Sequence, residues 1–129
     1  MLRYRVSSDS SPDELWPLLA RPERWPEWAP HLRGAWGLGS PEVEPGRRGA
    51  ARLLGIVPVP AAIVGKRAGQ SWAWRVGPVE MDHRLVPTRR GTAVEVTVDA
   101  PGLVEHTLHV TYGPVMKLAL RRLAARPAG

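Results

Sequence analysis

The stretch from residue 31 to residue 99 reads as a series of short strands, and this limits the possible folds more than any other feature of the sequence. Turn signals such as Gly77-Pro78 separate the strand-like segments. Connections this short join antiparallel neighbours, so we expect an antiparallel meander. The predicted strands are residues 31–38, 48–57, 59–66, 71–76, 80–86 and 92–99.

The beginning of the sequence adds one more strand and then a helix. Residues 2–8 alternate apolar and basic side chains, as a half-buried strand does, which makes about seven strands in all. Directly afterwards, Ser11 suits a helix N-cap and Pro12 suits the first helical position. Glu14 lies three residues after Ser11, where a capping box has its glutamate. Pro22 ends or bends this helix.

Helical patterns occur twice more. Residues 22–30 are bracketed by prolines and have room for one or two helical turns. From about residue 101 to 126 the apolar side chains return to helical spacing. This last helix either begins near Pro114 or is kinked at Gly113-Pro114. The order of elements predicts an α+β fold.

Alternation along three of the strands indicates which side chains face the interior. One face of each strand is apolar and the other carries polar side chains, so the apolar face should be the buried one. The inward residues are predicted to be Trp72, Trp74, Val76, Met81, His83, Leu85, Val94, Val96 and Val98.

The composition is that of an ordinary globular chain with a basic surplus. We expect one domain spanning residues 1–129, long enough to bury a core of its own. The absence of cysteine excludes disulfides, a thiolate nucleophile and sulfur-ligated zinc. The net charge of +6 comes from scattered arginines without a nucleic-acid-binding motif, so we expect no nucleic-acid partner.

Nothing in the sequence predicts insertion into a membrane. No run approaches the ~18 to 20 apolar residues that a membrane span requires, and the N-terminal residues do not form a signal peptide. We therefore expect a cytoplasmic protein, either a monomer or a homodimer. No cofactor is expected either, because no glycine-rich phosphate loop follows a strand.

Several short motifs, spread over nearly the whole chain, carry a resemblance to a known family. They are Ser11–Trp16, Pro22–Trp28, Val43–Gly46, Ser71–Trp74, Gly91-Thr92 and Leu120–Leu123. In this order and spacing they resemble the polyketide cyclase/dehydrase-like branch of the START-related and birch-pollen-allergen-related (SRPBCC) superfamily. The resemblance implies a helix-grip fold, in which a curved antiparallel sheet wraps around the last helix with an apolar cavity between them. It does not imply one reaction, since one fold hosts many functions.

Apolar side chains with a few polar groups line pockets for small organic molecules, and the inward face has this composition. The candidate ligand-binding residues are Trp36, Trp72, Trp74, Val76, Met81, His83, Leu85, Val96, Tyr112 and Met116. Indole combines a large apolar surface with one N–H donor, which suits such a wall. Trp72 and Trp74 either line the cavity or simply fill the core.

Four side chains are candidates for catalysis or metal binding. His83 and Tyr112 are the candidate acid/base residues, although His83 equally suits a neutral, buried histidine. His106 and His109 share a face only if their segment is helical, and no further ligand accompanies them, so we expect no metal site. The favoured function is binding of a hydrophobic or aromatic small molecule. The alternatives are a polyketide cyclase/dehydrase-type enzyme and an interaction domain with a collapsed cavity.

Overall fold

A computed structural model describes residues 2–29, 32–53, 58–102 and 113–125. Seven strands form one antiparallel sheet in the order β1-β7-β6-β5-β4-β3-β2. The strands are β1 (Leu2–Ser8), β2 (Leu32–Trp36), β3 (Arg48–Leu53), β4 (Pro58–Arg67), β5 (Ser71–Val76), β6 (Val79–Thr88) and β7 (Gly91–Asp99). From β2 to β7 each strand pairs with the next in sequence, which confirms the predicted meander. Closing the order, β1 pairs with β7 and forms one edge of the sheet.

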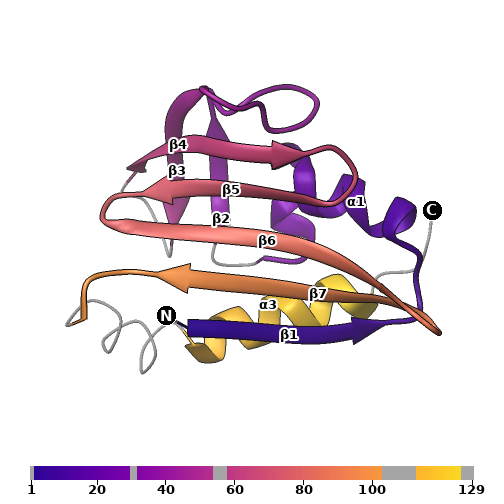
Figure 1. Ribbon diagram of the computed structural model, residues 1–129. Helices are drawn as coiled ribbons and strands as arrows, with labels where there is room; N and C mark the ends of the chain where they lie inside the picture. The colour runs from indigo at the N-terminus through magenta and orange to yellow at the C-terminus, as the bar shows by residue number, and fades with distance from the viewer. Residues whose placement is uncertain (1, 30–31, 54–57, 103–112, 126–129) are drawn as a thin grey trace.

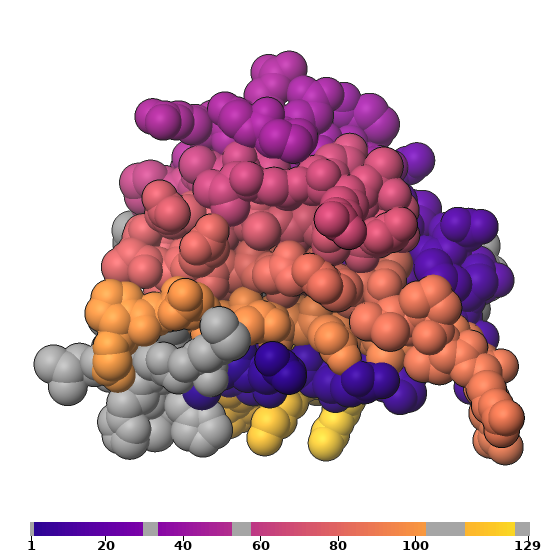
Figure 2. Space-filling model, in the orientation of Figure 1, coloured from indigo at the N-terminus to yellow at the C-terminus, as the bar shows by residue number. Residues whose placement is uncertain are grey.

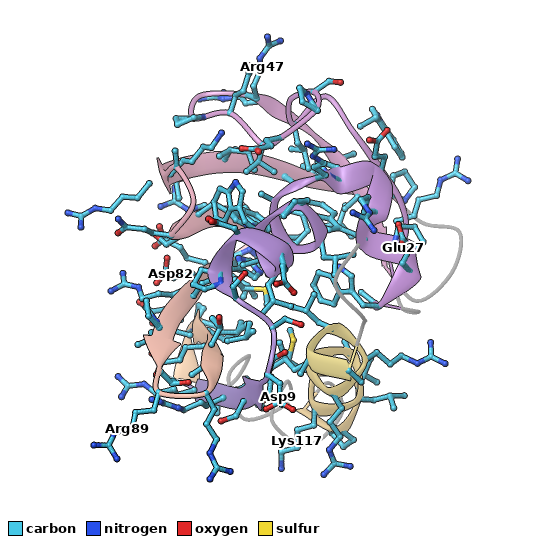
Figure 3. The ribbon with its side chains drawn as sticks, turned by 90° about the vertical axis from the view of Figure 1, so that its right-hand side faces the viewer. Asp9, Glu27, Arg47, Asp82, Arg89 and Lys117 are labelled. Carbon is cyan, nitrogen blue, oxygen red and sulfur yellow. The ribbon has the colours of Figure 1, made fainter. Side chains whose placement is uncertain are left out.

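The described helices lie on one side of this sheet. They are α1 (Pro12–Ala20), the 3₁₀ helix η1 (Pro22–Glu27) and α3 (Gly113–Ala125). In Figure 1, α1 and α3 lie behind the strands. Figure 2, in the same orientation, shows the outer face of the sheet, with α3 visible only beneath β1. Viewed from the side in Figure 3, side chains fill the space between the strands and the helices. This arrangement is the predicted helix-grip architecture.

The first helix begins as its sequence predicts. The Ser11 side chain accepts a hydrogen bond from the backbone N–H of Glu14 at 3.3 Å, which satisfies one of the free donors of the first turn. Pro12 occupies the first turn, where proline is tolerated. After Ala20 the chain turns extended at Arg21, and Pro22 opens η1.

The last helix is fixed to β1 near both of its ends. At its start, a Cβ added to Gly113 would lie 3.2 Å from the Tyr4 hydroxyl, so glycine allows the tyrosine to come this close. Near its end, the Ser8 hydroxyl donates to the carbonyl oxygen of Ala124 at 2.8 Å. The described helix runs from Gly113 to Ala125. Residues 103–112, where the predicted longer helix would continue beyond a kink, lie outside the described chain.

Candidate functional site

The predicted inward face of the sheet is buried. All nine residues on it are at most 7% exposed, and the eight apolar ones form part of one hydrophobic core. The strand register aligns them across the sheet: Trp72 lies opposite His83, and His83 opposite Val96. The next row places Met81 between Trp74 and Val98. Alternation therefore predicted the sidedness of these strands correctly.

Four rings fill the part of the interior that lies next to η1. Trp25 stacks on Trp72 with ring centroids 5.2 Å apart, and His83 stacks on Trp72 with centroids 4.0 Å apart. Trp74 meets Trp25 and Trp72 edge to face, at 5.1 and 5.5 Å. Aromatic pairs favour both geometries. These rings are a packed cluster, so this part of the interior has little space for a ligand.

The indole N–H groups of this region cap the C-terminal end of α1. Helix ends leave carbonyl oxygens without backbone partners. The carbonyl of Leu19 accepts from Trp25 at 2.8 Å and from Trp72 at 3.0 Å, and that of Leu18 accepts from Trp28 at 2.8 Å. Three of the six tryptophans thus tie the helix to η1 and to the sheet.

His83 lies inside the ring cluster and stays neutral. Burial disfavours the charged imidazolium and lowers the pKa of His83 to about 4, although its contact with a carbonyl opposes this shift. That contact joins Nδ1 to the Trp72 carbonyl oxygen over 3.3 Å. At neutral pH His83 is an uncharged core residue beneath the Trp72 ring.

Beyond Trp74 the concave face is not filled. A cavity of about 170 Å³ lies toward the end of the sheet where β5 turns into β6. Its walls are almost entirely apolar and come from β1, β4, β5, β6, β7 and the β5–β6 turn. The lining residues are Leu2, Tyr4, Val59, Trp74, Val76, Gly77, Pro78, Val79, Met81 and Val98.

Two side chains bring polar atoms to this region. Trp74 lines the cavity, and its buried Nε1 has no hydrogen-bond acceptor among the described residues. A buried donor without a partner costs about 1 to 3 kcal/mol, so an acceptor that reached it would stabilise the protein. Tyr4 also lines the cavity, and burial raises the pKa of its hydroxyl, which keeps the proton on the oxygen.

The structure brings together three of the ten candidate ligand-binding residues. Trp74, Val76 and Met81 line the cavity. The buried candidates outside the lining are Trp72, His83, Leu85, Val96 and Met116. Tyr112, together with the histidines at positions 106 and 109, lies outside the described residues.

Trp36 lies apart from the cavity. It is 47% exposed on β2, at the edge of the sheet opposite β1, and the Arg52 guanidinium lies 5.7 Å from its ring centroid. This is cation–π geometry at an exposed site.

Sequence reasoning did not single out several lining residues. Leu2 and Tyr4 share the inward face of β1, and their alternation was visible in the sequence. Their position beside Val98 follows only from the pairing of β1 with β7, which joins the two ends of the sheet-forming sequence. Val59 begins the predicted strand 59–66, for which no inward face was predicted, and Gly77 was assigned to a turn.

The described helices are all too short or too polar to span a bilayer.

Several solved structures share the fold of this chain. The chain resembles protein NE0264 from Nitrosomonas europaea, with a TM-score of 0.75 and 15% identity over 95% of this chain and 90% of that one. It resembles Ara h 8.0201 with a TM-score of 0.67 and 12% identity over 97% of each chain. DynU16, from the dynemicin biosynthetic locus, gives a TM-score of 0.75 and 19% identity over 95% of this chain and 45% of that one.

At these identities, the structures establish the shared fold alone. No curated protein matches the sequence. A family model described as "Polyketide cyclase / dehydrase and lipid transport" matches residues 2–127. This match confirms the resemblance seen in the sequence, and the chain belongs to that family of the SRPBCC superfamily.

Proposed function

We propose that this protein binds a small apolar or aromatic molecule in the cavity on the concave face of the sheet. The observation that carries the proposal is the cavity itself, a space of about 170 Å³ beside a fully packed ring cluster. An enclosed apolar void costs roughly 24 cal/mol per Å³. This cavity is partly open, so about 4 kcal/mol is an upper limit for the cost here. A ligand that fills the space would recover part of this free energy.

The dimensions and the lining suggest the class of ligand. An engineered apolar cavity of roughly 150 Å³ in another protein holds one benzene molecule. The cavity of about 170 Å³ therefore suits a ligand portion of about one aromatic ring. The walls of the cavity are almost entirely apolar, which favours a ligand portion without charged groups.

The described residues favour binding over catalysis. A general acid or base must come within hydrogen-bond distance of the reacting group. Among the described lining residues, only Tyr4 carries a titratable proton, and burial raises its pKa. His83 is outside the lining and neutral. The cyclase/dehydrase alternative thus has no acid–base pair in the described part of the cavity.

Two substitutions on one strand test the proposal. Val59 on β4 faces the cavity, whereas Val64 on the same strand is 44% exposed. Val59→Phe should fill the cavity with its own ring and weaken binding at least tenfold. Val64→Phe adds the same ring on the outside and should bind as the wild type does.

Binding would be measured by isothermal titration calorimetry with benzene, indole and naphthalene, after circular dichroism has shown that both variants are folded. We expect the wild type to bind at least one of these compounds. The proposal fails if none of them binds, or if folded Val59→Phe binds as tightly as Val64→Phe.

A further inference from the structure

A second hollow lies outside the concave face, in the groove between β1 and α3. It measures about 300 Å³. Its lining residues are Arg3, Tyr4, Arg5, Val6, Lys117, Leu120 and Arg121. Because β1 is an edge strand, this groove opens at the border of the sheet. In Figure 2, α3 projects beneath β1 along this border.

The groove concentrates positive charge. Of the seven described residues that line it, four are cations and none is an acid. Arg3 and Arg5 lie on the outward face of β1, opposite Tyr4, and Lys117 and Arg121 are one helical turn apart on α3. All four are exposed and therefore free to contact a ligand.

Little within the described chain neutralises these cations. Arg5 forms an ion pair with Glu95 on β7, and no described acid lies within ion-pair distance of the other three. The helix that supplies half of the cations, α3, contains no aspartate or glutamate. Like charges held side by side raise the free energy of the folded protein, and a bound anion would reverse this effect.

The number and type of cations favour phosphate over carboxylate. A phosphate group carries up to two negative charges and three acceptor oxygens, so it can pair with several cations at once. Guanidinium groups bind phosphate oxygens through two parallel hydrogen bonds, and two of the three unpaired cations are arginines. A carboxylate carries a single negative charge and leaves more of the positive charge in the groove without a counter-charge.

We propose that the groove between β1 and α3 binds a phosphate group, carried either by a lipid headgroup or by a soluble molecule. This groove is a different site from the concave cavity proposed to bind an apolar molecule, although Tyr4 lines both. The groove has an apolar floor of Val6 and Leu120 beneath its charged rim. An organic phosphate can therefore make apolar contacts as well as ionic ones.

The test compares two double variants with the same change in charge. Lys117→Glu/Arg121→Glu alters the groove, whereas Arg48→Glu/Arg67→Glu alters two exposed arginines on β3 and β4, toward the opposite edge of the sheet. Figure 3 shows Lys117 at the lower end of the molecule and Arg47, next to Arg48 in the chain, at the upper end. Each variant changes the formal net charge from +6 to +2, since two positive charges become two negative ones.

Two probes separate the possible sources of the phosphate. Cosedimentation compares vesicles of phosphatidylcholine and phosphatidylglycerol with vesicles of phosphatidylcholine alone. Calorimetry at constant ionic strength compares glycerol 3-phosphate with glycerol. We expect the groove variant to weaken binding of at least one phosphate probe by tenfold or more, since basic residues near an anionic surface each contribute about a factor of five.

The control variant should bind within about a factor of three of the wild type. Loss of vesicle binding would identify a lipid headgroup as the source, and loss of glycerol 3-phosphate binding a soluble phosphate. The proposal is overturned if neither probe binds the wild type, or if both variants lose binding equally, because the effect would then come from net charge alone.

Discussion

The end of α1 depends on three indole N–H groups, and removing them should have unequal effects. Pro22 has no backbone N–H, so the Leu18 carbonyl lacks the donor that a continuing helix would supply four residues later. Among the described residues, the Leu18 carbonyl accepts a hydrogen bond from the indole of Trp28 alone. The Leu19 carbonyl, in contrast, accepts from both Trp25 and Trp72.

This difference sets the expected magnitudes. The three indoles are similarly buried, at 1%, 5% and 2% exposed for Trp25, Trp28 and Trp72, so replacing each by Phe should lose comparable packing. Beyond packing, Trp28→Phe leaves a buried carbonyl unsatisfied, at about 1 to 3 kcal/mol. Trp25→Phe or Trp72→Phe leaves one donor in place and should lose only about 0.5 to 1.5 kcal/mol. The double variant Trp25→Phe/Trp72→Phe should exceed the sum of its single variants by about 0.5 to 3 kcal/mol.

Urea denaturation followed by circular dichroism would give the free energies of unfolding without relying on tryptophan fluorescence. For a domain of this size, each 1 kcal/mol also shifts the melting temperature by roughly 4 °C. The hydrogen bonds from the indoles to the Leu18 and Leu19 carbonyls do not stabilise the end of α1 if Trp28→Phe destabilises no more than Trp25→Phe. The same conclusion follows if the effects of Trp25→Phe and Trp72→Phe are additive.

Two further predictions concern stability. Because the folded pKa of His83 is about 4 and the ordinary value is 6.5, the unfolded chain binds more protons between these pH values, and stability should fall by up to ~3 kcal/mol as the pH drops from 6.5 to 4. His83→Phe should flatten this slope in urea titrations at several pH values, and an unchanged slope would exclude His83 as its source. Gly49→Ala should destabilise by about 1 to 3 kcal/mol or more, since its Cβ would lie 1.8 Å from the Trp36 carbonyl oxygen. Gly65→Ala, with nothing within 4 Å of the new Cβ, should be neutral or slightly stabilising, and equal denaturation midpoints for the two would contradict this contrast.

Most of the fold could be predicted because its signals are local. The alternation of β5, β6 and β7 fixed both their existence and their buried face, and Ser11, Pro12 and Glu14 marked the start of α1. Turn residues between strands fixed the antiparallel order. Each of these signals depends on residues within one strand or one helical turn, where spacing alone determines direction.

The position of the cavity could not be predicted in the same way. A period of two tells which side chains point inward, but it does not tell which of them have neighbours large enough to fill the space. By alternation alone, Trp72 and His83 are as good candidates for lining the cavity as Trp74 and Met81. They do not line it because Trp25, distant in sequence, stacks on Trp72. The hydrogen bond from Trp72 to the Leu19 carbonyl, 53 residues away, likewise has no signal in the sequence.

The hollow lies where it does because side-chain size decreases along β5. The inward residues of this strand run from Trp72 through Trp74 to Val76, and the chain then turns at Gly77, which has no side chain. At the Trp72 end, rings from η1 and β6 pack against the indole. At the other end, the lining includes Val59, Val79 and Val98, whose side chains are much smaller than an indole. Trp74 stands at the boundary, packed on one side and lining the cavity on the other, so both the core and a ligand can contact its ring, as they can that of Tyr4.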